Sequence, residues 1–230
     1  MNAYPQIEVL DENLVKIHAH ICGDGNMHKR LEKRSPSSIR TGRSTKPFNR
    51  YILEYTNTCP KLLDVMTKCI KNVYKEVYVC RTENKYRILV RVKAFYDFMI
   101  DMGYKDGKNW DIPREIVFNK KFRKIWLRAF FDDEGSVYKG HLMCYNSNKK
   151  AMLTIRKMLH LEGFKTSFLT RTIKYKGKSS PSYSIRILAC SYLLFEKIGF
   201  DHTDKKKKYE EFRKNRMRQL GLSPKMVLNS

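Results

Sequence analysis

The sequence carries the same order of segments twice, and this internal repeat limits the possible folds more than any other feature. Each half begins with an apolar helix that ends in an acid followed by glycine. Two strands, a helix, a hairpin and a short helix then follow in both halves. The predicted helices cover residues 10–23, 61–74, 95–102, 114–134, 149–161 and 192–198, and the predicted strands lie at 26–34, 49–57, 76–92, 136–138, 141–145 and 165–188. We therefore predict an α+β protein built from two pseudo-symmetric αββαββα units.

The two units are separated by a short segment rich in turn residues. Residues 104–113 contain Gly107 and Pro113, and the proline directly precedes the next predicted helix. We expect an N-terminal unit at 1–103, a linker at 104–113, a C-terminal unit at 114–218 and a tail at 219–230. A length of 230 residues suits either one large domain or two small ones.

The charge balance predicts a polyanionic partner. The chain has 47 Lys and Arg against 23 Asp and Glu, a net charge of +24. Apolar runs stay below the ~18 residues that a membrane-spanning helix needs, and the first residues lack the pattern of a secretory signal. The six cysteines are scattered without metal-binding spacing, so we interpret them as reduced core thiols.

Basic residues are concentrated on predicted strands and the loops beside them. Alternation of basic with apolar and aromatic residues gives such strands one apolar face and one basic face. Sheets of this kind fit the ~12 Å major groove of double-stranded DNA, which makes a DNA duplex the expected partner. Lys205–Lys208 is interpreted separately, as the exposed face of a terminal helix. The predicted DNA contacts are Lys29, Arg30, Lys33, Arg34, Arg40, Arg43, Arg50, Arg87, Arg91, Lys139, Arg171, Lys174, Lys176 and Arg186.

The first helix of each unit ends in a similar nine-residue segment. The repeat aligns Ile17–Gly25 with Leu127–Gly135, with a small residue at the third position, an acid at the eighth and glycine at the ninth. Close packing of the two helices would bring Asp24 and Glu134 to one point, where helix dipoles and mutual repulsion disfavour both charges. A hard divalent cation relieves that conflict and, beside a phosphate-binding sheet, suits phosphodiester hydrolysis. Either motif alone is most often a helix C-terminus with a turn, and only the pair in register within the repeat favours a site.

These residues resemble the LAGLIDADG homing endonucleases, in the monomeric form with two pseudo-repeats. The resemblance extends from about Asn13 to Phe212 and rests on the two nine-residue segments and on the run from Ile112 to Val137. The second motif matches closely and the first loosely. Two departures are visible: His20 stands where the family usually has Leu, and Asp133 stands where it prefers Ala or Gly. These departures imply that the packing between the two helices is modified.

The resemblance implies a fold and a set of site residues. The fold is a saddle of two antiparallel sheets in the DNA major groove, with the motif helices packed at the centre and both strands cut over the minor groove. Asp24 and Glu134 would be the catalytic acids and would bind Mg²⁺, the metal set extending to Gly23 and Asp133. Mn²⁺ or Ca²⁺ would occupy the same sites, with Ca²⁺ not supporting cleavage.

Further site residues follow from the same resemblance. Asn57 and Asn146, symmetric in the repeat, would help to place the attacking water, although an asparagine there also suits a turn or helix cap. A basic residue after the last helix of each unit would be Lys108 in the first unit and Lys205 or Lys206 in the second, with Lys206 taken as the choice; a solvated lysine is the alternative for each. His18 and His20 lie two apart on one helix, so they cannot share a metal, and we interpret them as core or surface residues.

The predicted function is a Mg²⁺-dependent, site-specific endonuclease that hydrolyses both strands of a long DNA target. The alternative on the same fold is an intron maturase or a nucleic-acid-binding protein without catalytic activity. We expect a monomer without an obligate protein partner, because the repeat supplies both motif helices. We expect it not to be secreted or membrane-bound, and to act in a prokaryotic cytoplasm or nucleoid, or in an organelle if an organellar intron encodes it.

Overall fold

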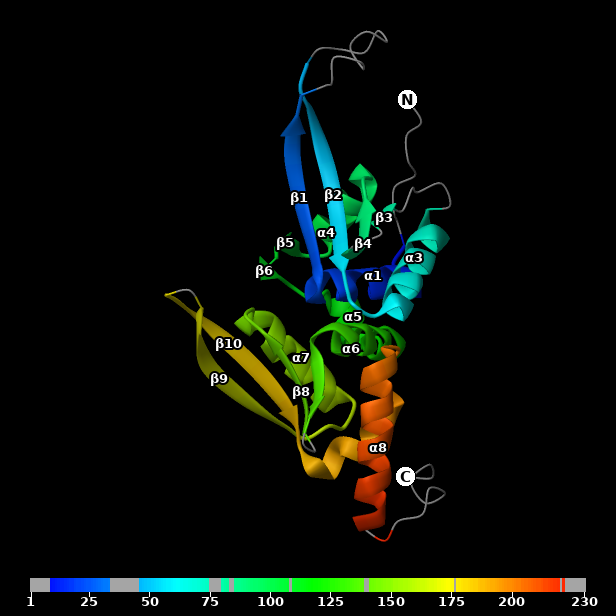
Figure 1. Cartoon of the computed structure of the whole chain (residues 1–230), viewed down its shortest axis with the longest axis vertical. Helices are drawn as coiled ribbons and strands as arrows, with labels where there is room; N and C mark the ends of the chain where they lie inside the picture. Colours follow the sequence, from blue (N-terminus) through cyan, green and yellow to red (C-terminus); the bar gives the residue numbers. More distant parts are fainter. Residues whose placement is uncertain are drawn as a thin grey trace.

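A computed structural model describes residues 9–33, 46–74, 80–82, 85–107, 109–138, 141–175, 177–219 and 221. Within this part, each half of the chain folds around one four-stranded antiparallel sheet, and two helices cross the centre between the sheets (Figure 1). The predicted α+β class and its two-sheet saddle are confirmed. None of the described helices is long and apolar enough to cross a bilayer.

The N-terminal half has the element order that the sequence predicts. Its strands pair in the order β1-β2-β4-β3, with the helices against one face of the sheet. The elements are α1 (Glu12–Gly23), β1 (Gly25–Glu32), β2 (Phe48–Thr56), α3 (Pro60–Val73), β3 (Cys80–Thr82), β4 (Lys85–Val90) and α4 (Lys93–Asp101).

The C-terminal half repeats this topology, with strands in the order β7-β8-β10-β9. Its elements are α5 (Arg114–Phe118), α6 (Lys120–Glu134), β7 (Gly135–Tyr138), β8 (His141–Asn146), α7 (Lys149–Leu161), β9 (Thr166–Tyr175), β10 (Lys178–Ile187), the 3-10 helix η1 (Ala189–Lys197) and α8 (Thr203–Gln219). The register is equivalent in the two sheets, because Gly25 pairs with Tyr55 and Gly135 pairs with Cys144. The repeat read from the sequence is therefore a repeat of structure.

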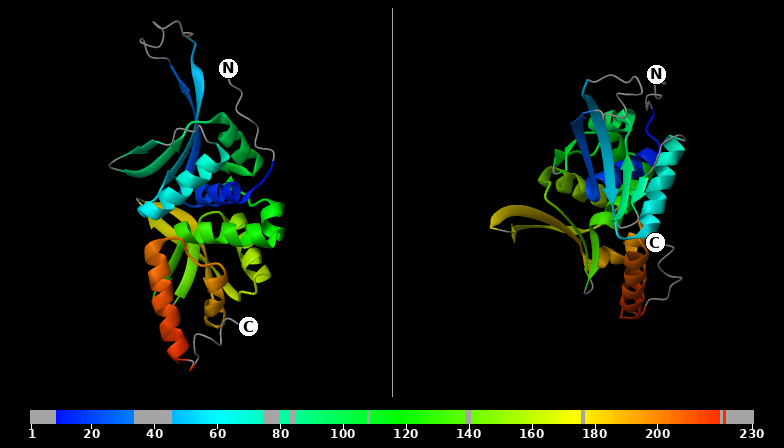
Figure 2. Two further views of the ribbon diagram at one scale, coloured as in Figure 1. Left: turned by 90° about the vertical axis from the view of Figure 1, so that its right-hand side faces the viewer. Right: turned by 45° about the horizontal axis from the view of Figure 1, so that its top comes forward.

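The helices α1 and α6 pack directly against one another and join the two halves (Figure 2). Ile17 and Ala19 of α1 are fully buried, as are Trp126 and Phe130 of α6. The Trp126 and Phe130 rings are stacked with centroids 5.0 Å apart. The apolar core is continuous across this contact, so neither half is an independent body.

The glycine after each acid is required by a close turn. A side chain on Gly25 would place its Cβ 2.4 Å from the Cα of Ile21, and one on Gly135 would lie 2.3 Å from the carbonyl oxygen of Phe131. Each strand therefore leaves its helix so tightly that only glycine fits at the first strand position. This geometry holds both acids at the junction of a helix and a strand.

The predicted continuous helix at 114–134 is wrong. The structure has two helices broken at Asn119, whose side-chain oxygen accepts from the backbone N–H groups of Lys121 and Phe122 and caps α6. The helix predicted at 192–198 is a longer 3-10 helix, Ala189–Lys197. The first error arises because the Asn119 cap, rather than apolar periodicity, decides where α6 begins.

The segment at 104–113 is more than a linker. It contains the short paired strands β5 (Tyr104–Asp106) and β6 (Asn109–Trp110). Tyr104 and Trp110 are buried, and the Trp110 ring lies 5.8 Å from that of Phe130 in α6. The connection therefore forms part of the central core.

Candidate active site

The two predicted acids occupy equivalent positions at the ends of the central helices. Asp24 is the C-cap of α1, and Glu134 is the last residue of α6. Because α1 and α6 pack side by side, both carboxylates lie close to Asp133 and to one lysine, Lys205. The structure thus brings together the two residues that the repeat aligned.

Each acid is held by one asparagine in the same way. The Asn57 amide nitrogen donates to Asp24 Oδ2 at 2.8 Å, and the Asn146 amide nitrogen donates to Glu134 Oε1 at 3.0 Å. The amide oxygens accept from the backbone N–H groups of Cys59 and Asn148, both at 2.9 Å. The amide oxygens therefore shape the turns, as the turn interpretation expects, and the amide nitrogens orient the acids, whereas placement of the attacking water stays a prediction.

Asp133 does not present its carboxylate as a metal ligand, contrary to the expectation from the resemblance. The carboxylate is fully buried and accepts from Tyr55 Oη at 2.7 Å, from Asn57 Nδ2 at 3.2 Å and pairs with His20 Nδ1 at 2.9 Å. Its backbone oxygen accepts from Lys205 Nζ at 2.7 Å. Gly23 likewise has no side chain to offer, and a Cβ there would lie 2.7 Å from that of Asp133.

Lys205, and not Lys206, is the basic residue at the acids. Its ammonium group donates to the carbonyl oxygens of Asp132 at 2.6 Å and Asp133 at 2.7 Å, at the C-terminus of α6. Lys206 is exposed and lines a separate pocket with Glu196 and Glu210. The sequence choice of Lys206 is therefore corrected.

The start of α8 is held in place by a residue that the sequence analysis missed. Asp132 Oδ1 accepts from the backbone N–H groups of Asp201 and His202, both at 2.9 Å. This contact fixes the chain just before α8 and aims Lys205 at the end of α6. Helical spacing toward Tyr209, the buried aromatic residue of α8, does not distinguish the two lysines, because Lys205 lies four residues before it and Lys206 lies three before it.

The surroundings disfavour negative charge at the acids. Burial, with the nearby Asp133 carboxylate, raises the pKa of Asp24 to about 6. Burial and the charge of Asp24 raise the pKa of Glu134 to about 8. Burial also lowers the pKa of Lys205, and the nearby carboxylates oppose that effect. A site with several acids and one cation favours the binding of further positive charge.

The two acids fit a divalent cation whose remaining ligands come from water and the substrate. No group of three or more His, Cys, Asp or Glu side chains in the described chain is arranged to hold a metal. Asp24 and Glu134 supply two carboxylates, and Mg²⁺ typically takes one or two of these together with waters and substrate phosphate oxygens. The site therefore suits a cation shared between protein and phosphate rather than an all-protein cage.

The sheet faces opposite the core carry arginines from both halves. In β1, β2 and β4 the register places Arg30, Arg50 and Arg87 on one face, while Met27 and Leu53 point into the core. Glu32 pairs with Arg50 at 2.8 Å and also with Arg30, and Glu54 pairs with Arg87 at 3.1 Å. These ion pairs hold the guanidinium groups in defined orientations, although arginine side chains are otherwise mobile.

The second sheet repeats this pattern in its own register. Arg171 and Arg186 lie on the face opposite the buried Ile185 and Ile187. Lys29 and Lys174 lie on the same sheet faces as the core residues, toward the far ends of their strands. They are therefore not part of the arginine faces. Lys33 and Arg91 are exposed just beyond strand ends. Six further candidates lie outside the described residues or side chains: Arg34, Arg40, Arg43, Lys108, Lys139 and Lys176.

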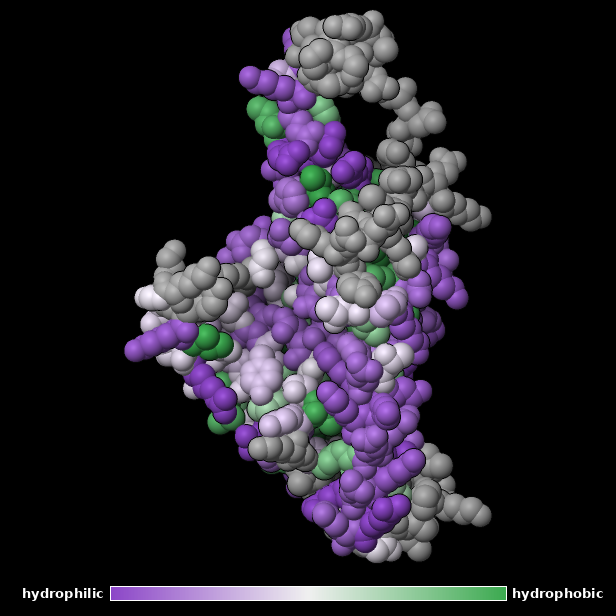
Figure 3. Space-filling model, in the orientation of Figure 1, coloured by the Kyte–Doolittle hydropathy of each residue, from purple (hydrophilic) through white to green (hydrophobic). Residues whose placement is uncertain are grey.

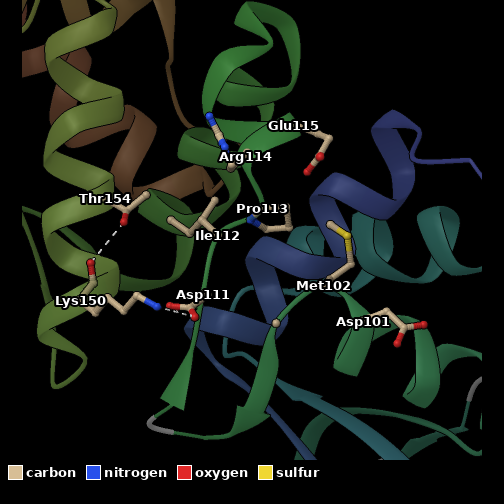
Figure 4. Close-up of a pocket in the computed structure, with 10 residues that line it drawn as sticks. Asp101, Met102, Asp111, Ile112, Pro113, Arg114, Glu115, Lys150 and Thr154 are labelled. Atoms are coloured by element: carbon tan, nitrogen blue, oxygen red, sulfur yellow. Dashed lines mark hydrogen bonds and ion pairs between the residues drawn. The ribbon is translucent and has the colours of Figure 1, made fainter.

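A separate cavity of about 380 Å³ lies beside the linker, bounded by α4, α5 and α7 (Figure 4). Lys150 closes one side through its ion pair with Asp111 at 2.8 Å. Arg114 and Glu115 lie on the other side. None of the predicted catalytic residues lines this cavity, so it is not the candidate active site.

Comparison with known proteins defines the class of fold. The chain has the fold of the LAGLIDADG homing endonucleases, which confirms at the level of structure the resemblance seen in the motifs. No model of a known protein family matches the sequence, and a search of curated proteins found no match.

The individual relatives are similar in structure and distant in sequence. One is a mesophilic variant of the homing endonuclease I-DmoI, 15% identical with a TM-score of 0.59 over 81% of this chain and 94% of that one. A second is I-DmoI in complex with DNA and Ca, also with a TM-score of 0.59, at 15% identity over 81% and 88% of the two chains. A variant of I-SmaMI has a TM-score of 0.53 at 11% identity over 93% and 92%.

Proposed function

We propose that this chain is a site-specific DNA endonuclease that hydrolyses phosphodiesters on both strands of a DNA duplex. The observation that carries the proposal is the pair of equivalent carboxylate–asparagine units, Asp24 with Asn57 and Glu134 with Asn146, which α1 and α6 bring to one point. The arginine faces of both sheets supply the complementary charge for phosphates and guanine edges. The fold shared with I-DmoI and I-SmaMI supports the same reaction class.

Asp24 and Glu134 would hold Mg²⁺ in this mechanism. The bound ion supplies Lewis-acid polarisation of the scissile phosphate and a more acidic water. Mn²⁺ or Ca²⁺ would take the same place, with Ca²⁺ not supporting cleavage. I-DmoI is known as complexes with DNA and Ca or Mn, and a variant of it with DNA and Mg, which supports use of a divalent ion here.

Three further side chains would orient the acids or add positive charge beside them: Asn57, Asn146 and Lys205. Asn57 uses its amide hydrogens on Asp24 and Asp133, so it orients the first carboxylate instead of holding the attacking water. Asn146 donates to Glu134 with one hydrogen and keeps the other for water or phosphate. Lys205 adds a positive charge at the end of α6, where the negative helix end is otherwise unfavourable for phosphate.

We further propose that the protein binds the DNA major groove as a monomer. Both motif helices belong to one chain, and α1 already covers the face of α6 that a second copy would need. Such a protein would act where its target DNA lies, in a prokaryotic cytoplasm or nucleoid or in an organelle, and would not be secreted.

The proposal is tested by cleavage of a randomised double-stranded DNA library in Mg²⁺ at several salt concentrations. We expect one long sequence motif to be cut, with binding that weakens as salt rises because Lys and Arg displace counterions from phosphate. Enrichment of bound sequences without cutting, in Mg²⁺ and in Mn²⁺, would contradict the nuclease proposal.

Metal affinity should depend steeply on pH. Because the pKa of Asp24 is raised to about 6 and that of Glu134 to about 8, both sites hold protons that an incoming cation must displace. We expect the apparent Mn²⁺ affinity to rise between pH 6 and pH 8, by up to about tenfold per pH unit for each proton released, and to level off above pH 8. Calorimetric titration at four pH values measures this, with Glu134→Gln as the control that flattens the slope. Equal affinities at pH 6 and pH 8 would contradict it.

The neighbouring lysines provide a matched pair for testing the basic residue. Lys205→Met should slow cleavage by on the order of a hundredfold, because it removes a preorganised charge beside the acids. Lys206→Met changes an exposed side chain on the next position of the same helix and should leave cleavage near the wild-type rate. Single-turnover rates on the selected target distinguish the two variants. Equal rates for both would contradict the assignment of Lys205.

A further inference from the structure

The interface between α1 and α6 contains a buried polar cluster on one side of the pseudo-twofold axis. Asp133 is its centre, and it is contacted by His20 from α1, Tyr55 from β2 and Asn57 from the turn after β2. Tyr55 and the side chains of His20 and Asp133 are at most 1% exposed. Its four members come from three segments and both halves of the molecule, and Asn57 also holds the acid Asp24.

The other side of the axis has no such cluster. The equivalents of His20, Tyr55 and Asp133 in the repeat are Phe130, Cys144 and Gly23. Phe130 and Cys144 are fully buried apolar residues, and glycine has no side chain to place beside Asn146. Asn146 therefore donates to Glu134 without the second carboxylate that Asn57 has.

We propose that Asp133 is a positioning residue that anchors Asn57, and through it Asp24, so that the two half-sites are unequal and the two DNA strands are cut in a fixed order. The catalytic part of this inference rests on the proposed function. Asp133 itself reaches neither acid with its side chain, because its carboxylate oxygens are occupied by Tyr55, Asn57 and His20.

The order of cutting follows from how firmly each acid is held in its orientation. The Asn57 amide makes three hydrogen bonds, to Cys59, Asp24 and Asp133, so its orientation is fixed before substrate binds. The Asn146 amide makes two, and its acid has one more rotatable bond, since Glu134 stands opposite Asp24. A group held in its reactive orientation loses less entropy on the way to the transition state. The half-site of Asp24 should therefore act first.

Strand-specific cleavage of a doubly end-labelled target tests the order. Asn57→Ala identifies the strand that depends on the first half-site, and we expect wild-type protein to cut that strand first. Asp133→Ala should slow the same strand by about 10- to 100-fold, the usual cost of losing a group that orients a ligand, and leave the other strand unchanged. Asn57→Ala and Asp133→Ala should be non-additive, because they act through one amide, whereas Asn146→Ala should slow the other strand.

Two further variants separate positioning from stability. Asp133→Asn keeps an oxygen for Tyr55 and Asn57 and an N–H for His20, so it should restore the order of cutting. Trp126→Phe removes another buried hydrogen bond between the halves, from Trp126 Nε1 to His18 Nδ1 at 2.9 Å, and should lower stability without changing the order. Equal slowing of both strands by Asp133→Ala, or failure of Asp133→Asn to restore the order, would overturn the proposal.

A measurement on the protein alone separates this inference from the proposed function. The side-chain amide resonances of Asn57 should move in Asp133→Ala and return in Asp133→Asn, while those of Asn146 stay in place. Unchanged Asn57 resonances would overturn the anchoring whether or not DNA is cut. Shifted Asn57 resonances in a protein that cuts no DNA would support the anchoring and overturn the proposed nuclease function together with the cutting order.

Discussion

The double variant Asp24→Asn/Glu134→Gln is expected to lose DNA cleavage and at the same time to become more stable at pH 8. Each acid has a folded-state pKa raised above its ordinary value, to about 6 and about 8, chiefly by burial. The folded protein then binds these protons more tightly than the unfolded chain, so its stability falls as pH rises from about 4 to about 8. Neutral amides of nearly the same shape remove this penalty and keep an oxygen for Asn57 and Asn146.

The expected loss of cleavage is at least about a hundredfold, the magnitude seen when one preorganised electrostatic contact is removed from an active site. DNA binding should be retained or tightened, because two negative charges near the phosphates are gone. Single-turnover cleavage, fluorescence anisotropy and urea unfolding at pH 8 measure the three effects. Wild-type cleavage in the double variant would refute the assignment of the acids, and a loss of stability would refute their placement against one another.

The two acids lower stability while serving the proposed activity, and this explains how the paired motif could be recognised from sequence. A pair of acids at the ends of two packed helices is costly for folding, so its presence in register within a repeat indicates a use. The same repeat gave the order of helices and strands along the chain and the equivalence of Asn57 and Asn146, because both depend on segment order and local turns. These are properties that neighbouring residues encode.

The parts of the site that were missed depend on contacts between distant segments. Asp133 departs from the family pattern at a position where a small residue suits helix packing, and its partners His20 and Tyr55 lie 113 and 78 residues away. No periodicity relates such residues, so the buried cluster appears only when α1, α6 and β2 are assembled. The choice of Lys206 over Lys205 failed for a related reason, since a run of four lysines hides which one faces inward until the contact of Asp132 with Asp201 and His202 places the start of α8.

The break between α5 and α6 shows a third kind of contact, which local sequence could only partly reveal. Asn119 is a good helix N-cap and gives a local signal for a new start. The preceding carbonyl of Val117 is satisfied by Arg123, whose Nη1 donates to it at 2.8 Å. Arg123 also reaches Glu162 beyond α7, donating from Nε at 2.7 Å. Arg123, a basic residue on an otherwise apolar face of α6, thus connects this helix to α5 and to the end of α7.

Arg123→Ala should therefore be among the most destabilising single changes in the chain. The Arg123 and Glu162 side chains are 7% and 4% exposed, so truncation leaves a buried carboxylate and an unsatisfied carbonyl oxygen. Breaking a buried ion pair from one side costs about 3–5 kcal/mol, and we expect a loss of that size in the free energy of unfolding. Arg123→Lys should recover little of it, because one ammonium group cannot contact Glu162 and the Val117 carbonyl with the planar fork of arginine.

Lys124 is the matched control, since it approaches the same carboxylate from the next position. Its Nζ lies 3.7 Å from Glu162 and its side chain is 32% exposed, so Lys124→Ala should cost less than about 1 kcal/mol. Urea unfolding of both variants compares them directly, and equal losses would show that Arg123 acts as an ordinary surface cation. Because α6 carries Glu134 at its far end, Arg123→Ala should also reduce cleavage at temperatures where the wild type remains folded, whereas Lys124→Ala should not.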